Sequence, residues 1–363
     1  MKIAIIGLPK SGKTTIFNAL TKGKAEVATY SPSVTPNMGV AKVPDSRLAM
    51  LENIFHPKKT VHAEVSYVDI AGSPKTFGSQ GEIGGEFLSY LTTADALLQV
   101  VRVFEDAKLP HPEGSTDPKR DIANFDLELA FSDLAIIERR LDRLEASLKG
   151  AKTPEREQHL KEQVLLQKIK AGLDEDIPIR QQALSEDELR ALSNYQFLTA
   201  KPMLLVLNIG EEQIPETSSL EKQISSLHPQ FAVVALCGKL EMELSQLDDS
   251  EAKEFREAMG LTTPTLDQII SLSHQLLGLI SFFTTASAEL RAWTIPSDTT
   301  APRAAGKVHS DMERGFIKAE VISYSDLERC GNVAEARKRG LLRIEGKHCI
   351  IQDGDIVTFL FHV

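Results

Sequence analysis

Residues Gly7–Thr14 read GLPKSGKT and match the phosphate-binding P-loop pattern G-x-x-x-x-G-K-[ST]. The apolar run Ile3–Ile6 precedes them and the helix-forming run Thr15–Leu20 follows, which is the strand, loop and helix that a P-loop needs. Glycines let backbone N–H groups turn towards the phosphates, and the helix N-terminus adds the positive end of its dipole. Lys13 supplies a cation and Thr14 a hydroxyl for Mg²⁺. This stretch therefore predicts a nucleotide-binding α/β domain.

The loop and the residue after it supply the predicted phosphate contacts. Lys13, the cation of the loop, is also a predicted catalytic residue. For Lys10 two interpretations stay open: it offers a charge to the β- and γ-phosphates and is catalytic, or it is a solvated surface lysine. A catalytic Lys10 predicts that Lys10→Asn lowers turnover without weakening binding. The predicted contacts are Gly7, Leu8, Pro9, Lys10, Ser11, Gly12, Lys13, Thr14 and Thr15.

A second motif narrows the class of nucleotide-binding protein. The apolar run Val65–Ile70 predicts a strand that ends in Asp69-Ile70-Ala71-Gly72, which matches the D-x-x-G pattern of the GTPase superfamily. Asp69 is predicted to hold Mg²⁺, usually through water. The N–H group of Gly72 is predicted to bond the γ-phosphate during catalysis. The two motifs together predict a switch NTPase.

Two further segments occupy the positions of switch loops. Ser31–Asn37 stands between the motifs, and either Ser33 or Thr35 is predicted to give Mg²⁺ a second hydroxyl; the sequence does not decide between them. The segment Ser73–Glu86 contains four glycines and predicts a mobile second switch. Many GTPases have a water-orienting glutamine where this chain has Ser73, and serine is too short for that task. We therefore expect slow hydrolysis, another way of orienting water, or binding alone.

Base recognition is expected where a later strand ends. The predicted strand Met203–Leu207 is followed by Asn208-Ile209-Gly210-Glu211, where most GTPases have N-K-x-D. Glu211 and Ile209 would put a longer carboxylate and an apolar contact at the base. Adenine lacks the paired N1 and N2 donors of guanine, so the usual reason to prefer guanine is weakened. Alternatively, Glu211 only begins an acidic surface segment. After the next strand, Cys237-Gly238-Lys239 matches the loop that closes over the base.

The bulk composition indicates a soluble protein of several domains. A chain of 363 residues is too long for one compact core. Its three widely spaced cysteines lack C-x-x-C pairing, so they suit a reducing compartment, offer no zinc site and predict a cytoplasmic protein. No signal-peptide run or membrane-spanning run is found, and neither a membrane nor DNA is expected as a partner. The net charge of −10 argues against wholesale wrapping of nucleic acid.

Hydrophobic periodicity predicts how the chain is organised. Its first part alternates strand-like and helix-like runs, which indicates a parallel sheet flanked by helices. Apolar residues then recur at alternating spacings of three and four, which is typical of a coiled-coil seam along one long helix. The run Glu155–Leu173 predicts a second helix that folds back as an antiparallel hairpin. The predicted seam comprises Leu127, Ala130, Leu134, Ile137, Leu141, Leu144 and Leu148.

The last portion indicates a small α+β module of short strands with two short helices between them. Within it, Asp353-Gly354 stands between two apolar pairs and predicts a hairpin turn. The predicted boundaries are residues 1–118 and 199–279 for the two parts of a P-loop NTPase domain, 119–198 for the helical coiled-coil insertion, and 280–363 for the C-terminal domain.

The chain resembles the YchF family, also called Obg-like ATPases, over essentially its full length. The resemblance is carried by the order of GLPKSGKT, DIAG, NIGE, the coiled-coil insertion and the C-terminal module. The C-terminal part is similar to that family's TGS domain, a β-grasp module, through LLGLISFFTTASAELRAWTI, AAGKVHSDMERGFIKAEVISYSDL and IIQDGDIVTFLFHV. The resemblance implies a translation-factor-related hydrolase that prefers ATP to GTP, depends on Mg²⁺, turns over slowly and associates with the ribosome or its rRNA. Two positions depart from the family pattern, which usually has asparagine at Lys10 and a hydrophobic residue at Ser73.

Together these features predict a cytoplasmic ATP- and GTP-binding P-loop protein that hydrolyses ATP in preference to GTP. Two alternatives stay open: a GTPase in which Glu211 reads guanine, and a nucleotide-gated binding module with negligible hydrolysis. Single-turnover hydrolysis separates the binding module from an enzyme. The triphosphate is predicted to order the switch loops and so to change how the C-terminal module and the coiled coil, a lever or a docking arm, meet a partner.

Overall fold

The computed structural model describes residues 1–23, 25, 36–70, 85–149, 152–259, 261, 264–286 and 288–362. Two compact units contain them. The first consists of Met1–Gly39 and Ser66–Thr265, and the second of Val40–Val65 and Leu266–Val363. The chain therefore leaves the first unit and returns to it before the second motif at Asp69.

The first unit is built on a six-stranded sheet in the order β2-β4-β1-β5-β6-β7. Each of the pairs β1–β4, β1–β5, β5–β6 and β6–β7 is parallel. β5 and β6 are buried along their whole length, because a parallel sheet is covered on both faces and its central strands are continuous apolar runs. The strands are β1 (Lys2–Ile6), β2 (Asn37–Lys42), β4 (Glu64–Asp69), β5 (Ala96–Arg102), β6 (Met203–Asn208) and β7 (Ala232–Leu236).

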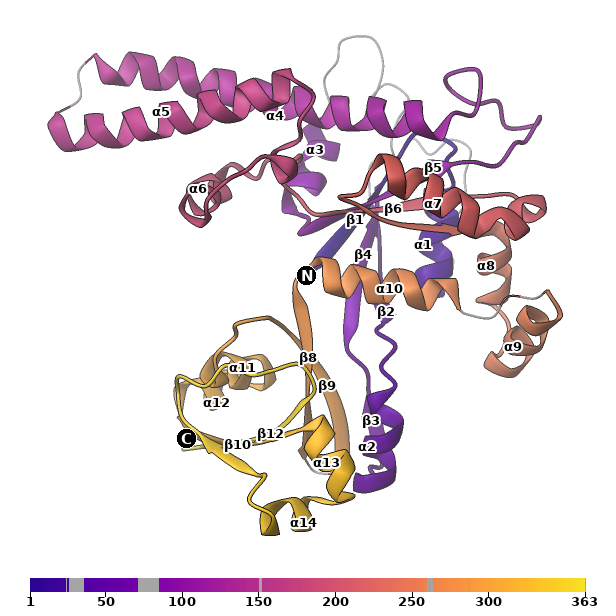
Figure 1. Cartoon of the computed structure of the whole chain (residues 1–363), viewed down its shortest axis with the longest axis vertical. Helices are drawn as coiled ribbons and strands as arrows, with labels where there is room; N and C mark the ends of the chain where they lie inside the picture. Colours follow the sequence, from indigo (N-terminus) through magenta and orange to yellow (C-terminus); the bar gives the residue numbers. More distant parts are fainter. Residues whose placement is uncertain are drawn as a thin grey trace. The chain divides into compact units, whose positions relative to one another are not determined.

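Helices of the first unit complete its core (Figure 1). Phe87 and Leu91 of α3 and Phe125 of α4 pack in one cluster with Leu97 of β5 and Leu205 of β6. Because these strands run parallel, their carboxyl ends meet at one edge of the sheet. Loops gather at that edge, as in other α/β nucleotide-binding folds. The helices around the sheet are α1 (Lys13–Thr21), α3 (Gly85–Thr93), α7 (Thr217–Leu227), α8 (Gly238–Leu244) and α9 (Asp249–Ala258), with a 3₁₀ helix at Glu211–Glu216.

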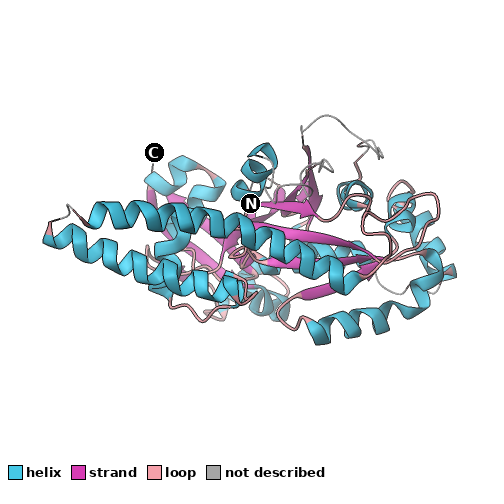
Figure 2. Ribbon diagram, turned by 90° about the horizontal axis from the view of Figure 1, so that it is seen from above, coloured by secondary structure: helices cyan, strands magenta, loops and turns pink. Residues whose placement is uncertain are grey.

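A pair of long helices, α4 (Pro118–Leu148) and α5 (Thr153–Asp174), forms the predicted hairpin. Figure 2 shows the two helices lying side by side. The expected seam residues Ala130, Ile137 and Leu144 are buried against residues of α5. The expectation for Leu127 is wrong, since this residue is 40% exposed. The first turns of α4 pack on the sheet through a different face, which carries Ile122, Phe125 and Leu129.

The chain returns from the hairpin through short helices. These are the 3₁₀ helix Ile179–Gln181, α6 (Glu186–Leu192) and the 3₁₀ helix Ser193–Tyr195. A capping box at Ser185 and Glu188 begins α6. Within the described residues, no helix combines the length and the apolar character needed to cross a membrane, and this includes the 31-residue α4.

A buried carboxylate fixes the base of the hairpin. Asp133 of α4 is 0% exposed and accepts hydrogen bonds from the backbone N–H groups of Leu198 and Thr199, both at 2.8 Å, and from the Thr199 hydroxyl at 2.7 Å. Burial raises the pKa of Asp133 to about 6, and these hydrogen bonds and the nearby Arg180 partly offset that effect. Asp133 thereby joins α4 to the segment that enters β6.

The second unit contains a mixed six-stranded sheet in the order β11-β10-β12-β8-β9-β3. β12–β8 and β3–β9 are parallel pairs, and β8–β9, β10–β11 and β10–β12 are antiparallel. One core cluster contains Phe282, Ala305, Val321 and Phe359. The strands are β3 (Lys59–Val61), β8 (Leu279–Ala286), β9 (Glu289–Pro296), β10 (Phe316–Ser323), β11 (Arg343–Glu345) and β12 (Asp355–Phe361). The helices are α2 (Arg47–Phe55), α10 (Thr265–Leu276), α11 (Ala301–Val308), α12 (Ser310–Arg314), α13 (Tyr324–Cys330) and α14 (Val333–Lys338).

Residues 40–65 lie in the second unit, whereas the sequence indicated a nucleotide domain spanning residues 1–118. Strand pairing and charge explain the difference. β3 pairs with β9, and the Arg47 guanidinium bonds both Asp45 and Asp353 while lying 5.2 Å from the centre of the Phe283 ring. Long-range contacts of this kind leave no local pattern in a sequence.

The predicted hairpin turn at Asp353-Gly354 is wrong. Ile350 forms only an isolated bridge with Thr300, and β12 pairs with β10 and β8 instead. The turn joins β8 through two bonds: the Gly354 N–H donates to the Ser281 carbonyl at 2.8 Å, and Asp353 accepts from the Ser281 N–H at 2.9 Å. A positive φ of 86° explains the glycine at position 354.

Candidate nucleotide-binding site

The P-loop connects β1 to α1 at the carboxyl edge of the first sheet. Gly7 and Gly12 have φ angles of 144° and 96°, which residues that carry a side chain rarely adopt. Close packing adds to this requirement, because a Cβ on Gly7 would lie 2.3 Å from the Val100 carbonyl oxygen and one on Gly12 would lie 2.1 Å from Nδ2 of Asn208. Both glycines of the motif therefore let the loop pack closely against Val100 of β5 and Asn208 of β6.

The other loop residues differ in exposure. Lys10 is exposed and has a positive φ of 63°, a conformation that asparagine tolerates better than lysine. Ser11 is 1% exposed, and its Oγ has no hydrogen-bond partner among the described residues. Half-buried residues make up the remainder: Leu8, Pro9 and, on the first turn of α1, Thr15.

Lys13 is the first residue of α1 and turns back over the loop. Its Nζ donates to the carbonyl oxygens of Gly7 and Leu8, both at 3.1 Å. Burial lowers the pKa of Lys13 to about 8, and the Asp69 carboxylate partly offsets this shift. Lys13 thus places its ammonium group inside the loop, where phosphate oxygens would bind.

Asp69 at the end of β4 lies beside the start of α1. Its Oδ2 accepts hydrogen bonds from the Thr14 hydroxyl at 2.8 Å and from Nδ2 of Asn37 at 3.3 Å. Asp69 is 1% exposed, and its Oδ1 has no hydrogen-bond partner among the described residues. Such an orphaned buried acceptor beside a threonine hydroxyl fits one side of a Mg²⁺ site, because Mg²⁺ in NTPases takes few protein ligands and fills its shell with phosphate and water.

In the described part of the chain, no group of three or more His, Cys, Asp or Glu side chains is arranged to hold a metal ion. The metal ligands that the described residues offer are therefore one carboxylate, from Asp69, and one hydroxyl, from Thr14. No motif in the sequence pointed to the contact from Asn37, which is the last residue of the predicted first switch loop. Ser33, Thr35 and Gly72, which the sequence predicted as metal or phosphate contacts, lie outside the described residues.

Asn208 ties the P-loop to the loop after β7. Its Nδ2 donates to the Ser11 carbonyl at 2.9 Å, and its Oδ1 accepts from the Gly238 N–H at 3.0 Å. Gly238 packs closely here, since a Cβ would lie 2.7 Å from Cδ1 of Ile16 and 2.9 Å from Oδ1 of Asn208 and would force these side chains to shift. The structure therefore brings together Asn208 and Gly238, two residues that the sequence predicted for the base side of the site.

Glu211 and Lys239, also predicted at the base, form an ion pair. The Lys239 Nζ lies 3.0 Å from Oε1 of Glu211, and this hydrogen bond is the main reason that the pKa of Lys239 is raised. Both side chains are more than half exposed. Cys237 beside them is buried, which raises the pKa of its thiol.

The prediction that Ile209 provides an apolar contact to the base is not supported. Its side chain is 2% exposed and packs in the cluster with Phe231 and Ala235. Side chains alternate between the faces of a strand, so the residue after Asn208 turns away from the P-loop and into the core on the other face.

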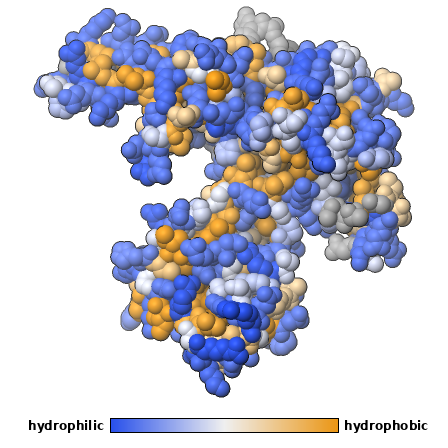
Figure 3. Space-filling model, viewed as in Figure 1, coloured by the Kyte–Doolittle hydropathy of each residue, from blue (hydrophilic) through white to orange (hydrophobic). Residues whose placement is uncertain are grey.

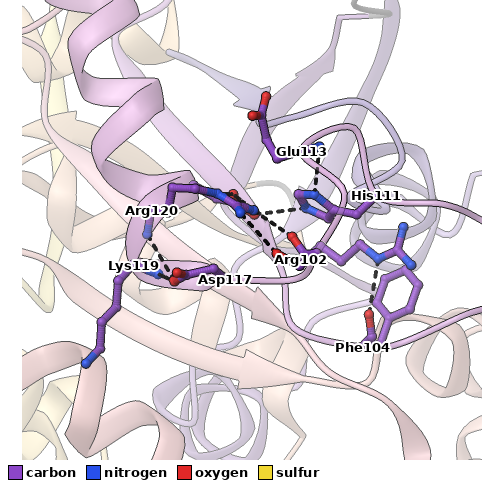
Figure 4. Close-up of polar contacts among 9 residues, drawn as sticks. Arg102, Phe104, His111, Glu113, Asp117, Lys119 and Arg120 are labelled. Carbon is purple, nitrogen blue, oxygen red and sulfur yellow. Dashed lines mark hydrogen bonds and ion pairs between the residues drawn. The ribbon is translucent and has the colours of Figure 1, made fainter.

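A polar cluster follows β5 at the same edge of the sheet (Figure 4). Arg102 pairs with Asn208 in the strand register, is 2% exposed, and lies with its guanidinium 4.4 Å from the centre of the Phe104 ring. Nε2 of His111 lies 3.0 Å from Oδ2 of Asp121, and the other carboxylate oxygen of Asp121, Oδ1, accepts hydrogen bonds from Arg120. This cluster holds the loop between β5 and α4 against the start of α4. The residues of this loop match no short motif, so the sequence carried no signal for the cluster.

Nucleotide binding is expected to weaken as the pH rises above the pKa of Lys13. Lys13 attracts phosphate only when it is protonated, and bound phosphate raises its pKa, so binding at high pH takes up a proton. A pKa of about 8 in the free protein predicts that the affinity for ATP falls about tenfold between about pH 7 and about pH 9. Calorimetric titration in two buffers that differ in ionisation enthalpy measures the affinity for ATP and the number of protons taken up on binding. A constant affinity without proton uptake over this range would contradict the prediction.

Comparisons with known proteins cover the whole chain. A family model described as 50S ribosome-binding GTPase matches residues 2–140. A second model, for the C-terminal part of YchF GTPases and described as a protein of unknown function, matches residues 279–362. The chain is 38% identical over 366 residues to the ribosome-binding ATPase YchF of Bacillus subtilis, covering 99% of this chain and 98% of that protein. It is 39% identical to the ribosome-binding ATPase YchF of Pasteurella multocida, covering 100% of this chain and 99% of that protein. Among solved structures, the Schizosaccharomyces pombe YchF GTPase matches with a TM-score of 0.87 and 32% identity, covering 99% of this chain and 97% of that chain.

Proposed function

The chain belongs to the YchF family, and from this premise we propose that it is a cytoplasmic, Mg²⁺-dependent switch protein that hydrolyses ATP in preference to GTP and associates with the ribosome. The observation that carries the proposal is the convergence of Lys13, Thr14 and Asp69 at one end of the P-loop. Asn208 joins the loop at Ser11 to the Gly238 segment. Phosphate and base subsites therefore share one edge of the sheet, which supports binding of a whole nucleotide.

Each part of the phosphate subsite has its own task. Lys13 offers its ammonium group to the β- and γ-phosphates, and the backbone N–H groups after Gly7 turn towards them. Thr14 and Asp69 would hold Mg²⁺. The metal would supply positive charge beside the phosphates, which favours phosphoryl transfer. The roles of Gly72 as the γ-phosphate contact and of Lys10 as a second catalytic cation stay predictions.

The ion pair between Glu211 and Lys239 supports the preference for ATP. In a typical GTPase a free carboxylate accepts hydrogen bonds from N1 and N2 of guanine. Here Lys239 already occupies Oε1 of Glu211 at 3.0 Å, so the carboxylate is partly satisfied before any base binds. Adenine presents no paired donors that would compete with Lys239. We therefore assign Glu211 and Lys239 to base selection.

The switch is proposed to act through the residues that flank Asp69 and Asn37. Asn37, the last residue of the first switch loop, begins β2, and Asp69, the first residue of the D-x-x-G motif, ends β4. Triphosphate and metal would order both switch loops, and hydrolysis would release them. We propose that residues 119–198 and the TGS-like domain, residues 280–363, carry the change to a ribosomal partner, with rRNA as the component bound.

The test of base selection is calorimetric titration of ATP and GTP analogues, each with Mg²⁺, against the wild type and Glu211→Asp. We expect the wild type to bind the ATP analogue more tightly. In the variant, the shorter carboxylate loses its contact with Lys239, and the ratio of the two affinities should move towards GTP by about tenfold. Glu212→Asp is the matched control, because it makes the same change at the neighbouring exposed position.

Each other outcome selects an alternative. Tighter GTP binding by the wild type would make the protein a GTPase in which Glu211 reads guanine. Equal binding of both nucleotides by both proteins would mean that Glu211 does not select the base. If the wild type binds ATP but forms no ADP in a single-turnover experiment, the protein is a nucleotide-gated binding module rather than an enzyme.

A further inference from the structure

The distal part of the helical hairpin, residues 139–161, carries a local excess of positive charge. It contains seven Lys and Arg residues and four Asp and Glu residues, whereas the whole chain has a net charge of −10. The excess surrounds the turn between α4 and α5. The basic residues are Arg139, Arg140, Arg143, Lys149, Lys152, Arg156 and Lys161.

Charge pairing changes along the hairpin. Nearer the base, basic side chains bond carboxylates: Lys170 lies 3.0 Å from Glu138, and Lys168 lies 2.8 Å from Glu188. The last such pair towards the turn is Arg140–Glu162, at 2.7 Å. Beyond it, within the described residues, no ion pair involves Arg143, Lys149, Lys152, Arg156 or Lys161. These five side chains are exposed.

The stability of the hairpin does not explain these unpaired charges. Its packing comes from the apolar seam, in which Ile137 and Leu144 of α4 are buried in one cluster with Leu166 and Ile169 of α5. Exposed charges on the outer faces of such helices contribute little to stability. Basic side chains outnumber the exposed acidic side chains at this end of the hairpin, which are Asp142, Glu145, Glu155 and Glu157. The local excess of positive charge therefore favours a bound anion.

We propose that this distal surface, centred on Lys149 and Arg156, binds the phosphate backbone of ribosomal RNA. The inference rests on the ribosome association proposed above and names the surface that makes the contact. With an α-helical rise of about 1.5 Å per residue, Lys149 stands about 24 Å along α4 from the anchored Asp133. The hairpin therefore presents its unpaired cations far from the anchored base, at the distal end of two packed helices.

RNA is favoured over a ribosomal protein by the kind of surface at the turn. The exposed apolar side chains of α5, Leu160 at 42% and Val164 at 65%, lie on the base side of Arg156, and the described residues on either side of the turn, Lys149 and Lys152, are exposed lysines. On the face shown in Figure 3, the hairpin surface is likewise hydrophilic with interspersed apolar residues. Lysine and arginine side chains without internal partners can release counterions from phosphates, which is the main source of affinity for RNA.

The experiment compares ribosome binding by the wild type and by the double variant Lys149→Glu with Arg156→Glu. Full-length proteins are titrated against purified 70S ribosomes over a range of salt concentrations, with the ATP analogue and Mg²⁺ present. We expect the double variant to bind at least about tenfold more weakly near 0.1 M salt. The slope of the logarithm of affinity against the logarithm of salt concentration should become about two units shallower, because two phosphate contacts are lost.

The control is Lys222→Glu with Lys253→Glu, which makes the same change in net charge at exposed positions on α7 and α9. Wild-type affinity in the control and weak binding in the distal variant would support the proposal. Equal affinity of the distal variant and the wild type would overturn it, and so would an equal loss in the control. A loss caused by Leu160→Ser with Val164→Ser, with no change in the charge variant, would assign the contact to a ribosomal protein. Failure of the wild type to bind ribosomes would instead refute the proposed function.

Discussion

Replacing Lys13 by methionine is expected to lower the affinity for ATP with Mg²⁺ by about 100-fold or more, and turnover at low ATP at least as much. The lost charge-assisted bonds to phosphate are worth about 3 kcal/mol, and every 1.4 kcal/mol is about tenfold in affinity. Methionine keeps the apolar stem of the side chain but not the donor that now bonds the Gly7 and Leu8 carbonyls. Calorimetric titration and a phosphate-release assay measure the two losses.

Lys222→Met is the matched control for this change, because Lys222 is an exposed lysine on α7. It should bind ATP as the wild type does. Circular dichroism of both variants establishes that each has folded. Affinity of Lys13→Met within about threefold of the wild type would mean that Lys13 does not face the phosphates and that the proposed site is wrong.

Replacing Asp133 by alanine is expected to destabilise the first unit by about 3 to 5 kcal/mol. The variant leaves three buried donors without an acceptor: the N–H groups of Leu198 and Thr199 and the Thr199 hydroxyl. Each unsatisfied buried donor costs about 1 to 3 kcal/mol, and a water molecule that enters the space offsets part of the sum. Denaturation by urea, followed by circular dichroism, measures the loss. Hydrogen exchange of the amides at residues 198 and 199 locates it.

Asp142→Ala is the control for Asp133→Ala, since Asp142 lies on the same helix but is exposed. It should change the stability by less than about 0.5 kcal/mol. Equal destabilisation by both variants would show that helix propensity, and not the buried hydrogen bonds, determines the effect. Unchanged amide protection at residues 198 and 199 in Asp133→Ala would also contradict the role given to Asp133.

The sequence predicted the parts of this protein that depend on short local patterns. An α/β fold with an inserted helical hairpin and a C-terminal α+β part followed from periodicity and motifs, and the relationship to the YchF family was confirmed by full-length matches. The P-loop was predictable because its strand, glycines and lysine are contiguous in the chain. Phosphate chemistry requires backbone N–H groups beside a helix N-terminus, and eight consecutive residues are enough to specify that arrangement.

Several errors share one physical cause, which is the contact between residues distant in the chain. Leu127 fits the heptad spacing, yet the face of α4 that is buried changes where the helix leaves α5 and packs on the sheet. Asp353-Gly354 has the composition of a hairpin turn, but bonds to Ser281 take it to another strand. Local composition does not encode these two choices. The burial of Ile209 has a local cause instead, because strand alternation directs the side chain after Asn208 into the core.

By itself, the sequence determined that this chain has a P-loop, a D-x-x-G motif and an N-x-x-E motif, because each is a short run of residues with its own chemistry. Only the tertiary structure decided that Asn208 bonds both Ser11 and Gly238, that Lys239 neutralises Glu211, and that Asp133 anchors the hairpin. Those partners lie 28 to 197 residues apart. Hydrogen bonds and ion pairs form between side chains that folding brings together, and the free energy that selects them belongs to the packed chain as a whole.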